Sequence, residues 1–160
     1  LTGENNLIRA AQRVLELGPK IGRVLPLICY EAVFPGIPRA VARPDWMVQV
    51  TNDAWFGREG CAVQHAAHSV LRSIETQKPF IRCGNAGWSG WIDSRGHQRD
   101  VLRDDSGSIY FQGAKILNVS IPAHSRGSVS FYTQYGNWFV YLCMGVGLML
   151  ILSFRKNLIP

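Results

Sequence analysis

Residues 46–83 read WMVQVTNDAWFGREGCAVQHAAHSVLRSIETQKPFIRC, and this stretch decides the fold of the chain. It begins with an apolar run over 46–51 that is rich in residues favouring strands. Apolar residues then recur at helical spacing and predict a helix over 62–77, which Pro79 terminates. A further apolar run over 80–83 predicts another strand. Strands that alternate with helices in this way indicate an α/β fold.

Further elements are expected on both sides of this stretch. The apolar run Arg23–Tyr30 (RVLPLICY) predicts a strand, and its near-continuous apolarity is typical of a strand covered on both faces. Trp88–Asp93 and Lys115–Ile121 are also predicted strands. A turn is expected over residues 93–96 (DSRG), because Asp and Gly occupy its first and last positions. The pattern of Leu7–Leu17 fits a helix or a strand equally well.

The composition suits one folded domain. The chain has 160 residues, of which 47% are hydrophobic and 18% charged, so it can bury a core. Its formal net charge is +6, but the basic residues are scattered, and no basic run is longer than Arg155–Lys156. We therefore do not expect nucleic-acid binding. The chain opens at Leu1 without an initiator Met, which favours a fragment of a longer protein.

Neither a metal nor a cofactor is predicted. The four cysteines stand at positions 29, 61, 83 and 143, and no pair has the C-x-x-C spacing of a zinc or thioredoxin-like site. His65 and His68 are three residues apart on the predicted helix, a spacing that could suit a metal. No third ligand accompanies them, so packing or capping is the favoured interpretation.

The C-terminal segment Trp138–Phe154 contains 17 residues without a charge. A helix of about 25 Å results, which is the short limit for crossing a bilayer. Aromatic residues at its start and Arg155–Lys156 at its end favour a membrane span over a buried core helix. We therefore expect residues 1–137 to form a domain outside the cytoplasm, 138–154 to span the membrane, and 155–160 to form a short basic cytoplasmic tail.

Cys29 follows the apolar run Pro26–Ile28, at the expected end of a strand. A nucleophile placed there is held rigidly and can face a cleft. From spacing alone, however, a cysteine at a strand end is more often a packed thiol.

Several segments, in order and at matching spacing from Lys20 onward, resemble the C-terminal half of the apolipoprotein N-acyltransferases, a family within the carbon–nitrogen hydrolase (nitrilase) superfamily. The segments are Leu27–Glu31 (LICYE) with Phe34-Pro35, Thr51–Gly57 (TNDAWFG), Gln64-His65, Arg72–Glu75 (RSIE), Pro79, Arg82–Gly87 (RCGNAG), Ile92–Gly96 (IDSRG), Phe131-Tyr132 and Tyr135–Trp138 (YGNW).

The resemblance implies a four-layer α-β-β-α sandwich on the periplasmic face of a bacterial inner membrane, with a Glu-Lys-Cys triad and no cofactor. Cys29 matches the nucleophile, and Tyr30 and Glu31 match supporting residues beside it. The implied reaction transfers an acyl chain from a phospholipid, through a Cys29 thioester, to the N-terminal amine of a diacylglyceryl-cysteine lipoprotein. The implied partners are therefore a phospholipid donor, an apolipoprotein acceptor and the membrane.

Five residues are expected to form the substrate pocket. Asn52, together with Asp53, would shape a loop at a strand end by bonding the backbone. The aromatic side chains of the group would line an acyl-chain site, although core packing is an equally good interpretation for Trp88 and for the neighbouring Trp91. The predicted pocket residues are Asn52, Trp55, Phe56, Asn85 and Trp88.

The chain departs from the family pattern at the other two triad members. The family's Glu and Lys precede the segments matched here, and neither Glu4 nor Lys20 lies in the corresponding motif. The isolated chain is therefore expected not to catalyse the transfer. Two alternatives stay open: an amidase or nitrilase-type hydrolase of a soluble substrate, and a non-catalytic, membrane-tethered fragment.

Overall fold

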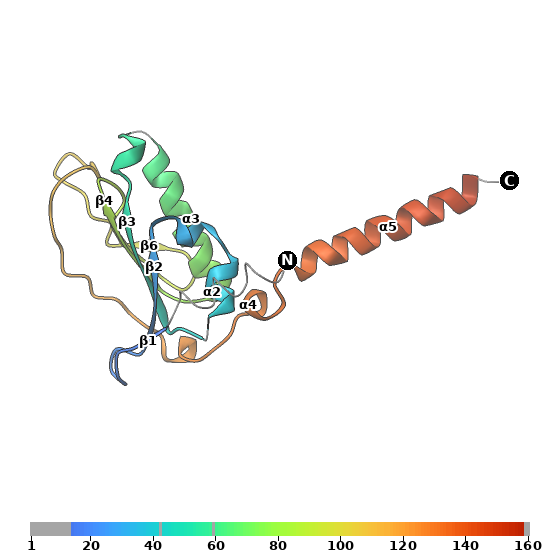
Figure 1. The fold of residues 1–160 in the computed structure, drawn as a ribbon, viewed down its shortest axis with the longest axis horizontal. Coiled ribbons are helices and arrows are strands. Elements are labelled where there is room, and N and C mark those ends of the chain that lie inside the picture. Colours follow the sequence, from blue (N-terminus) through green and yellow to red (C-terminus); the bar gives the residue numbers. More distant parts are fainter. Residues whose placement is uncertain (1–13, 42, 59, 159–160) are drawn as a thin grey trace.

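The computed structural model describes residues 14–41, 43–58 and 60–158. Within them one six-stranded sheet is formed, and its strands lie side by side in chain order (Figure 1). The inner strands β2, β3 and β4 are parallel, whereas β1, β5 and β6 join antiparallel at the two edges. The strands are β1 Leu15–Glu16, β2 Arg23–Ile28, β3 Trp46–Asn52, β4 Phe80–Asn85, β5 Gly90–Ile92 and β6 Gln98–Arg99.

One face of the sheet is covered by helices. The long helix α3 (Cys61–Thr76) connects β3 to β4 and packs on this face beside the short helix α2 (Gly36–Ala40) (Figure 1). Side chains alternate along a strand, so Leu25, Leu27, Met47 and Phe80 all point to this face, and all are fully buried. The other helical elements are the 3-10 turns η1 (Cys29–Val33), η2 (Ala54–Phe56) and η3 (Ala123–Ser125), and the helices α4 (Phe131–Tyr135) and α5 (Trp138–Leu158).

The opposite face of the sheet is only partly covered. Ile28 and Val50 point to it and are 66% and 53% exposed, and Cys83 is exposed beside them. Residues 111–117 run past this face without forming a strand and help to enclose a cavity against it. The sheet therefore has one packed face and one accessible apolar face.

The α/β prediction and its central elements are confirmed. The helix predicted over 62–77 is α3, and the runs at 46–51 and 80–83 are β3 and β4. The strand predicted over Arg23–Tyr30 ends earlier, at Ile28, because Cys29 leaves the extended conformation with φ +51°. The strand predicted over Trp88–Asp93 is limited to Gly90–Ile92.

The prediction of a strand over Lys115–Ile121 was wrong. This segment has no regular structure, and Ile116 within it is 90% exposed. An apolar segment becomes a strand only where a neighbouring strand pairs with its backbone, and in the described part of the chain the sheet ends at β6. Of the ambiguous segment Leu7–Leu17, residues 7–13 lie outside the described residues, and Leu15–Glu16 forms β1.

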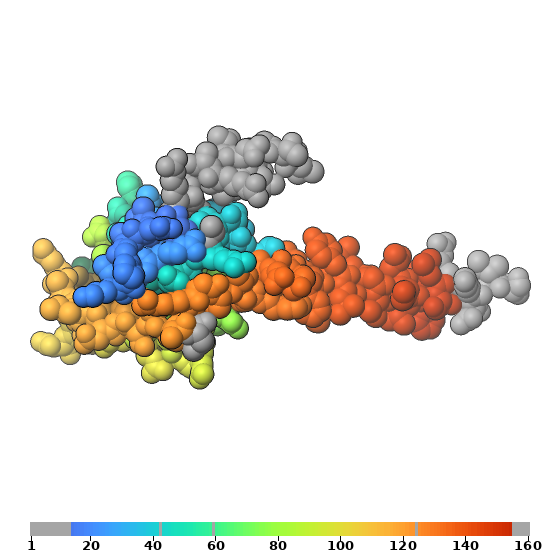
Figure 2. All heavy atoms as spheres, turned by 90° about the horizontal axis from the view of Figure 1, so that it is seen from below, coloured from blue at the N-terminus to red at the C-terminus, as the bar shows by residue number. Residues whose placement is uncertain are grey.

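Helix α5 extends away from the globular part (Figures 1 and 2). Its apolar side chains point outward along its length, for example Phe139, Tyr141, Met144 and Met149. Among the described residues, no helix combines the length and apolarity that crossing a bilayer requires. The helical conformation predicted for 138–154 is confirmed, whereas the membrane span is not.

The predicted turn over residues 93–96 is present and packs against α3. The N–H group of Gly96 donates to the carbonyl of Asp93 at 3.0 Å. Gly96 has φ +86°, and a Cβ atom there would lie 2.6 Å from Cγ1 of Ile74 on α3. The turn therefore requires glycine both for its backbone conformation and for its close approach to the helix.

We expect Gly96→Ala to lower the free energy of unfolding by about 2–4 kcal/mol, because left-handed strain and a steric clash with Ile74 both act. Gly107→Ala is the matched control, since Gly107 has φ +83° but nothing within 4 Å of the added Cβ. Strain alone predicts a loss of about 1–2 kcal/mol there. Denaturant unfolding in mild detergent measures both losses, and equal losses would show that the turn does not press on α3.

Candidate functional site

Cys29 stands at the carboxyl end of β2, where the chain turns sharply into η1. Its φ of +51° is unusual for a residue with a side chain and costs on the order of 1–3 kcal/mol. The N–H group of Ile28, just before it, donates to Oε2 of Glu31 at 2.7 Å. Glu31 therefore closes the turn, and Cys29 is presented at its apex.

Cys29 lines a cavity whose volume is about 790 Å³. The cavity lies against the accessible face of the sheet, near the carboxyl ends of the parallel strands. Its lining is mainly apolar, with Ile28, Val50 and Ile81 on the sheet side and Phe111 and Leu117 on the other. A cavity with such a lining suits a ligand that carries a hydrocarbon group.

On the packed side of the sheet, Gln49 holds the backbone of Cys29. Its amide Nε2 donates to the carbonyl of Cys29 at 2.6 Å. Its Oε1 accepts from Ser69 at 2.8 Å and from Nη1 of Arg82 at 2.7 Å. Because both donors point at Oε1, the amide must present its N–H groups to Cys29. This side chain is fully buried and cannot exchange these partners for water.

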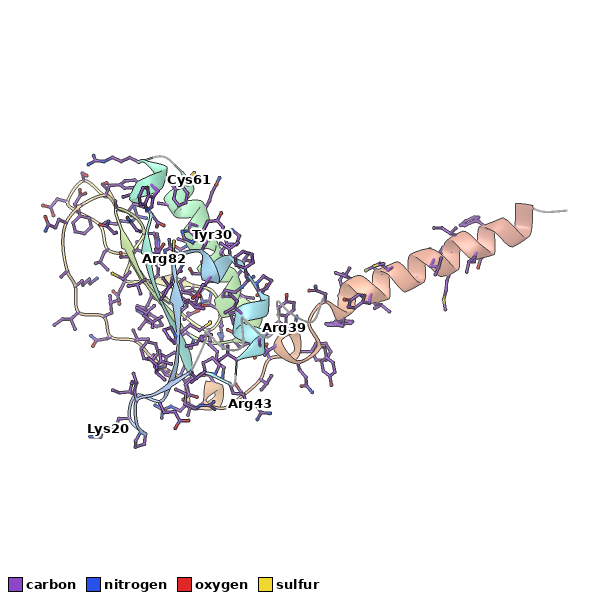
Figure 3. All side chains as sticks on the ribbon, in the orientation of Figure 1. Lys20, Tyr30, Arg39, Arg43, Cys61 and Arg82 are labelled. Carbon is purple, nitrogen blue, oxygen red and sulfur yellow. The ribbon has the colours of Figure 1, made fainter. Side chains whose placement is uncertain are left out.

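Arg82 and Asp53 form a buried ion pair next to Gln49. Nη2 of Arg82 lies 2.6 Å from Oδ2 of Asp53, and neither side chain is exposed. The other oxygen of Asp53 lies 2.8 Å from Nδ1 of the buried His65 on α3. These bonds join β4, the loop after β3 and α3. Arg82 is labelled in Figure 3, near Tyr30.

The charge of Arg82 is the central electrostatic feature of this network. Burial lowers the pKa of Arg82 below its ordinary value, and the charge and hydrogen bond of Asp53 oppose that shift. The Arg82 cation is therefore kept inside the protein by its pairing with Asp53.

The sequence model of the carbon-nitrogen hydrolase family matches residues 7–117. The chain belongs to this family.

The chain is also similar to curated proteins that are named apolipoprotein N-acyltransferase. That of Geobacter metallireducens is 37% identical over 139 residues, covering 85% of this chain and 25% of the relative. That of Bradyrhizobium diazoefficiens is 36% identical over 140 residues, covering 87% and 24%. The chain thus spans about a quarter of the length of these relatives. A solved carbon-nitrogen hydrolase superfamily protein, XC1258 from Xanthomonas campestris, is 22% identical with a TM-score of 0.46, covering 56% of this chain and 39% of that one.

In this carbon-nitrogen hydrolase chain, the residues predicted to support Cys29 lie immediately beside it. Tyr30 is half exposed, and its ring lies 5.3 Å from that of His65. Glu31 uses its carboxylate to accept the Ile28 N–H bond and so stabilises the turn. Their catalytic roles stay predictions.

Two of the predicted pocket residues meet at the carboxyl ends of β3 and β4. Asn52 and Asn85 are register partners, and Nδ2 of Asn85 donates to Oδ1 of Asn52 at 2.9 Å. The same oxygen accepts from the N–H group of Ala54 at 3.2 Å, so Asn52 bonds the loop backbone as expected. Both asparagines line the cavity that contains Cys29. Asp53, in contrast, bonds side chains of the buried network.

The predicted aromatic pocket residues do not line this cavity. Trp55 is 83% exposed, and Phe56 packs edge-on against His65 with 6.3 Å between ring centroids. Trp88 is buried in the core beside the sheet, as is Trp91. Core packing therefore accounts for the apolar surroundings of Trp88, and a substrate role for these aromatics stays a prediction.

Gln49 was not predicted as a site residue, and Arg82 was noted only as the first residue of the segment Arg82–Gly87. Their positions could have indicated burial. Gln49 is two residues after Met47, and Arg82 is two residues after Phe80, so in an apolar strand each polar side chain points to the same face as a buried apolar one. His65 was expected to pack or cap, and it is buried against Asp53. In the described part of the chain, no cluster of three or more His, Cys, Asp or Glu side chains could hold a metal ion.

We expect Arg82→Met to lower the free energy of unfolding by about 3–5 kcal/mol, because it leaves the Asp53 carboxylate buried without its cation. Adding Asp53→Asn should restore part of that loss, since no buried charge then stays unpaired. Arg95→Met, at an exposed arginine, should change stability by less than about 0.5 kcal/mol. Denaturant unfolding measures the three variants; a loss at Arg82 no larger than at Arg95 would contradict the role of the pair.

Proposed function

We propose that this chain is the nucleophile-bearing part of an apolipoprotein N-acyltransferase, and that Cys29 is the nucleophile. The observation that carries the proposal is the position of Cys29. Cys29 takes a strained left-handed conformation at the carboxyl end of β2. There Gln49 bonds its backbone carbonyl, and Cys29 lines an apolar cavity. Relatives named for this activity match most of the chain.

The proposed reaction has two acyl transfers. The Cys29 thiolate attacks an ester carbonyl of a phospholipid, the carbonyl–oxygen bond breaks, and a lysophospholipid leaves with a proton. The resulting thioester is attacked by the free α-amine of a diacylglyceryl-cysteine lipoprotein. The carbon–sulfur bond then breaks, the amide forms, and the amine proton returns to the thiol side. Apolar lining such as Ile28, Val50 and Ile81 suits the hydrocarbon chain of the acyl group.

The remaining groups of the mechanism match no position of these 160 residues. The family resemblance implies a glutamate as proton acceptor and donor, and a lysine that stabilises the oxyanion. We therefore propose that the reaction belongs to the whole protein in which this chain occurs. The tests of activity use that whole protein.

Cys29→Ala should abolish both the acyl-enzyme and the transfer, lowering turnover by about 10³-fold or more. The whole protein is incubated with phospholipid labelled in its acyl chain, and a hydroxylamine-sensitive thioester and transfer to a diacylated peptide are measured. Cys83→Ala is the matched control, because Cys83 lines the same cavity and is exposed. It should keep both signals. Acyl transfer that persists in Cys29→Ala would show that Cys29 is not the nucleophile.

We also propose that α5 anchors the chain in a bacterial inner membrane, with the globular part on the periplasmic side. The support is its uncharged run over 138–154, with apolar side chains exposed along the helix, followed in sequence by Arg155–Lys156. The basic pair suggests a cytoplasmic C-terminus. An anchor here would hold the cavity near its proposed lipid substrate.

The anchor predicts that the purified chain floats with phosphatidylcholine vesicles in a density gradient. Met144→Asp with Leu148→Asp should reduce the floating fraction strongly, because each charge in an apolar helix costs about 2.5–3.5 kcal/mol on insertion. Ile116→Asp is the control, since Ile116 is 90% exposed on the globular part. Equal flotation of the α5 variant and this control would contradict the anchor.

A further inference from the structure

A second cavity, of about 430 Å³, lies at the other end of the sheet from Cys29. It is formed where the chain enters β3 and β4, whereas Cys29 follows the carboxyl end of β2. In Figure 3, Arg39 and Arg43 lie near α4, away from Tyr30 and Arg82. The cavity is therefore separate from the proposed catalytic site.

The lining of this cavity carries positive charge. It contains Arg39, Arg43 and Lys78 together with hydroxyl and amide groups, and no carboxylate. Lys78 is already engaged, because its ammonium donates to the carbonyl of Ser125 and to Oγ of Ser128. Burial lowers the pKa of Lys78, and the nearby Asp45 opposes that effect. Lys78 thus adds charge to the cavity beside the side chains of Arg39 and Arg43.

Arg39 has no hydrogen-bond acceptor among the described residues, and its Nε is buried without a partner. The charge of Arg39 acts on Glu75, where together with that of Arg72 it opposes the rise in the Glu75 pKa caused by burial, but the carboxylate is bonded by Arg72 through contacts of 2.7 and 2.8 Å. The guanidinium of Arg39 instead lies 5.4 Å from the ring centroid of Tyr132 and packs closely on Gly136. A buried donor left without an acceptor costs about 1–3 kcal/mol, and an anion bound beside the guanidinium would offset that cost.

We propose that this cavity binds the phosphate group of a membrane phospholipid, with Arg39 as its main ligand. A guanidinium presents parallel N–H groups that match two phosphate oxygens, and Arg43 adds a second cation. Ser128, Thr133 and Gln134 line the same cavity and offer further donors. Tyr132 and Gly136 hold the guanidinium in place, so little conformational freedom is lost on binding.

The position of the cavity favours a lipid as the source of the phosphate. Thr133 and Gln134 belong to α4, and only Gly136 and Asn137 separate α4 from the apolar helix α5. The start of α5 carries Trp138, Phe139 and Tyr141, and aromatic residues of this kind lie at the level of lipid headgroups. The choice of a lipid source rests on the proposed anchoring by α5, whereas the anion site does not.

The test measures phosphate binding to the full chain in non-ionic detergent by calorimetry. The probes are dihexanoylphosphatidylglycerol and inorganic phosphate, each titrated separately. We expect the chain to bind the short-chain lipid more tightly than inorganic phosphate. Arg39→Gln should weaken lipid binding about tenfold, as expected for loss of a charged hydrogen bond. Arg95→Gln, an exposed arginine outside the cavity, should bind like the unchanged chain.

Each outcome decides the proposal. Equal lipid affinity in Arg39→Gln and Arg95→Gln, with both folded by circular dichroism, overturns the site. Inorganic phosphate that binds as tightly as the lipid overturns the lipid source. If Arg39→Gln does not fold, the exposed Arg43→Gln replaces it, and undiminished binding there overturns the site. The titration measures binding and involves no acyl transfer, so failure of the proposed reaction is distinguishable from failure of this site.

Discussion

The ion pair of Arg82 and Asp53 is the interaction on which the rest of the structure depends. Both side chains are withdrawn completely from water, so each charge must be met by the other and by hydrogen bonds. Asp53 satisfies this requirement by reaching β4 through Arg82 and α3 through His65. The loop after β4 approaches it so closely that a side chain at Gly87 would overlap the carboxylate. One buried charge pair thereby fixes the relative positions of two strands, a helix and a glycine loop.

The two faces of the sheet differ in their exposure to solvent. The face beneath α3 holds the polar network and the buried apolar core, and it is closed to solvent. The other face keeps apolar side chains such as Ile28 and Val50 accessible and carries the cavity. Cys29 stands between the two, because its carbonyl is bonded from the closed side while it lines the cavity on the open side. The rigidity of one face therefore serves the chemistry proposed for the other.

Sequence periodicity predicted the helices and strands that are defined by a local pattern of residues. It did not predict features that depend on pairing between segments far apart in the chain. The runs that became β3 and β4 are apolar over several residues, and α3 has a regular helical stripe. The register that places Gln49 opposite Arg82 joins residues far apart in the chain, and no local pattern reveals it. Lys115–Ile121 has the composition of a strand, but composition does not show whether a partner strand is present. The two-residue strands β1 and β6 are too short to leave a periodic signal.

The conformation of Cys29 could not be predicted from residue spacing either. It depends on the hydrogen bonds of Gln49, Arg82 and Asp53, which connect the buried polar network to Cys29. A left-handed φ at a residue with a side chain persists only where the surroundings hold it. Gln49 provides such a hold, but only while its amide faces the correct way. Ser69 and Arg82 set that orientation by both donating to Oε1, and Asp53 in turn holds Arg82. The ion pair buried beneath α3 thus acts on Cys29 through Gln49 and the bonded backbone. A substitution that spared the thiol but disordered Gln49 would remove this hold.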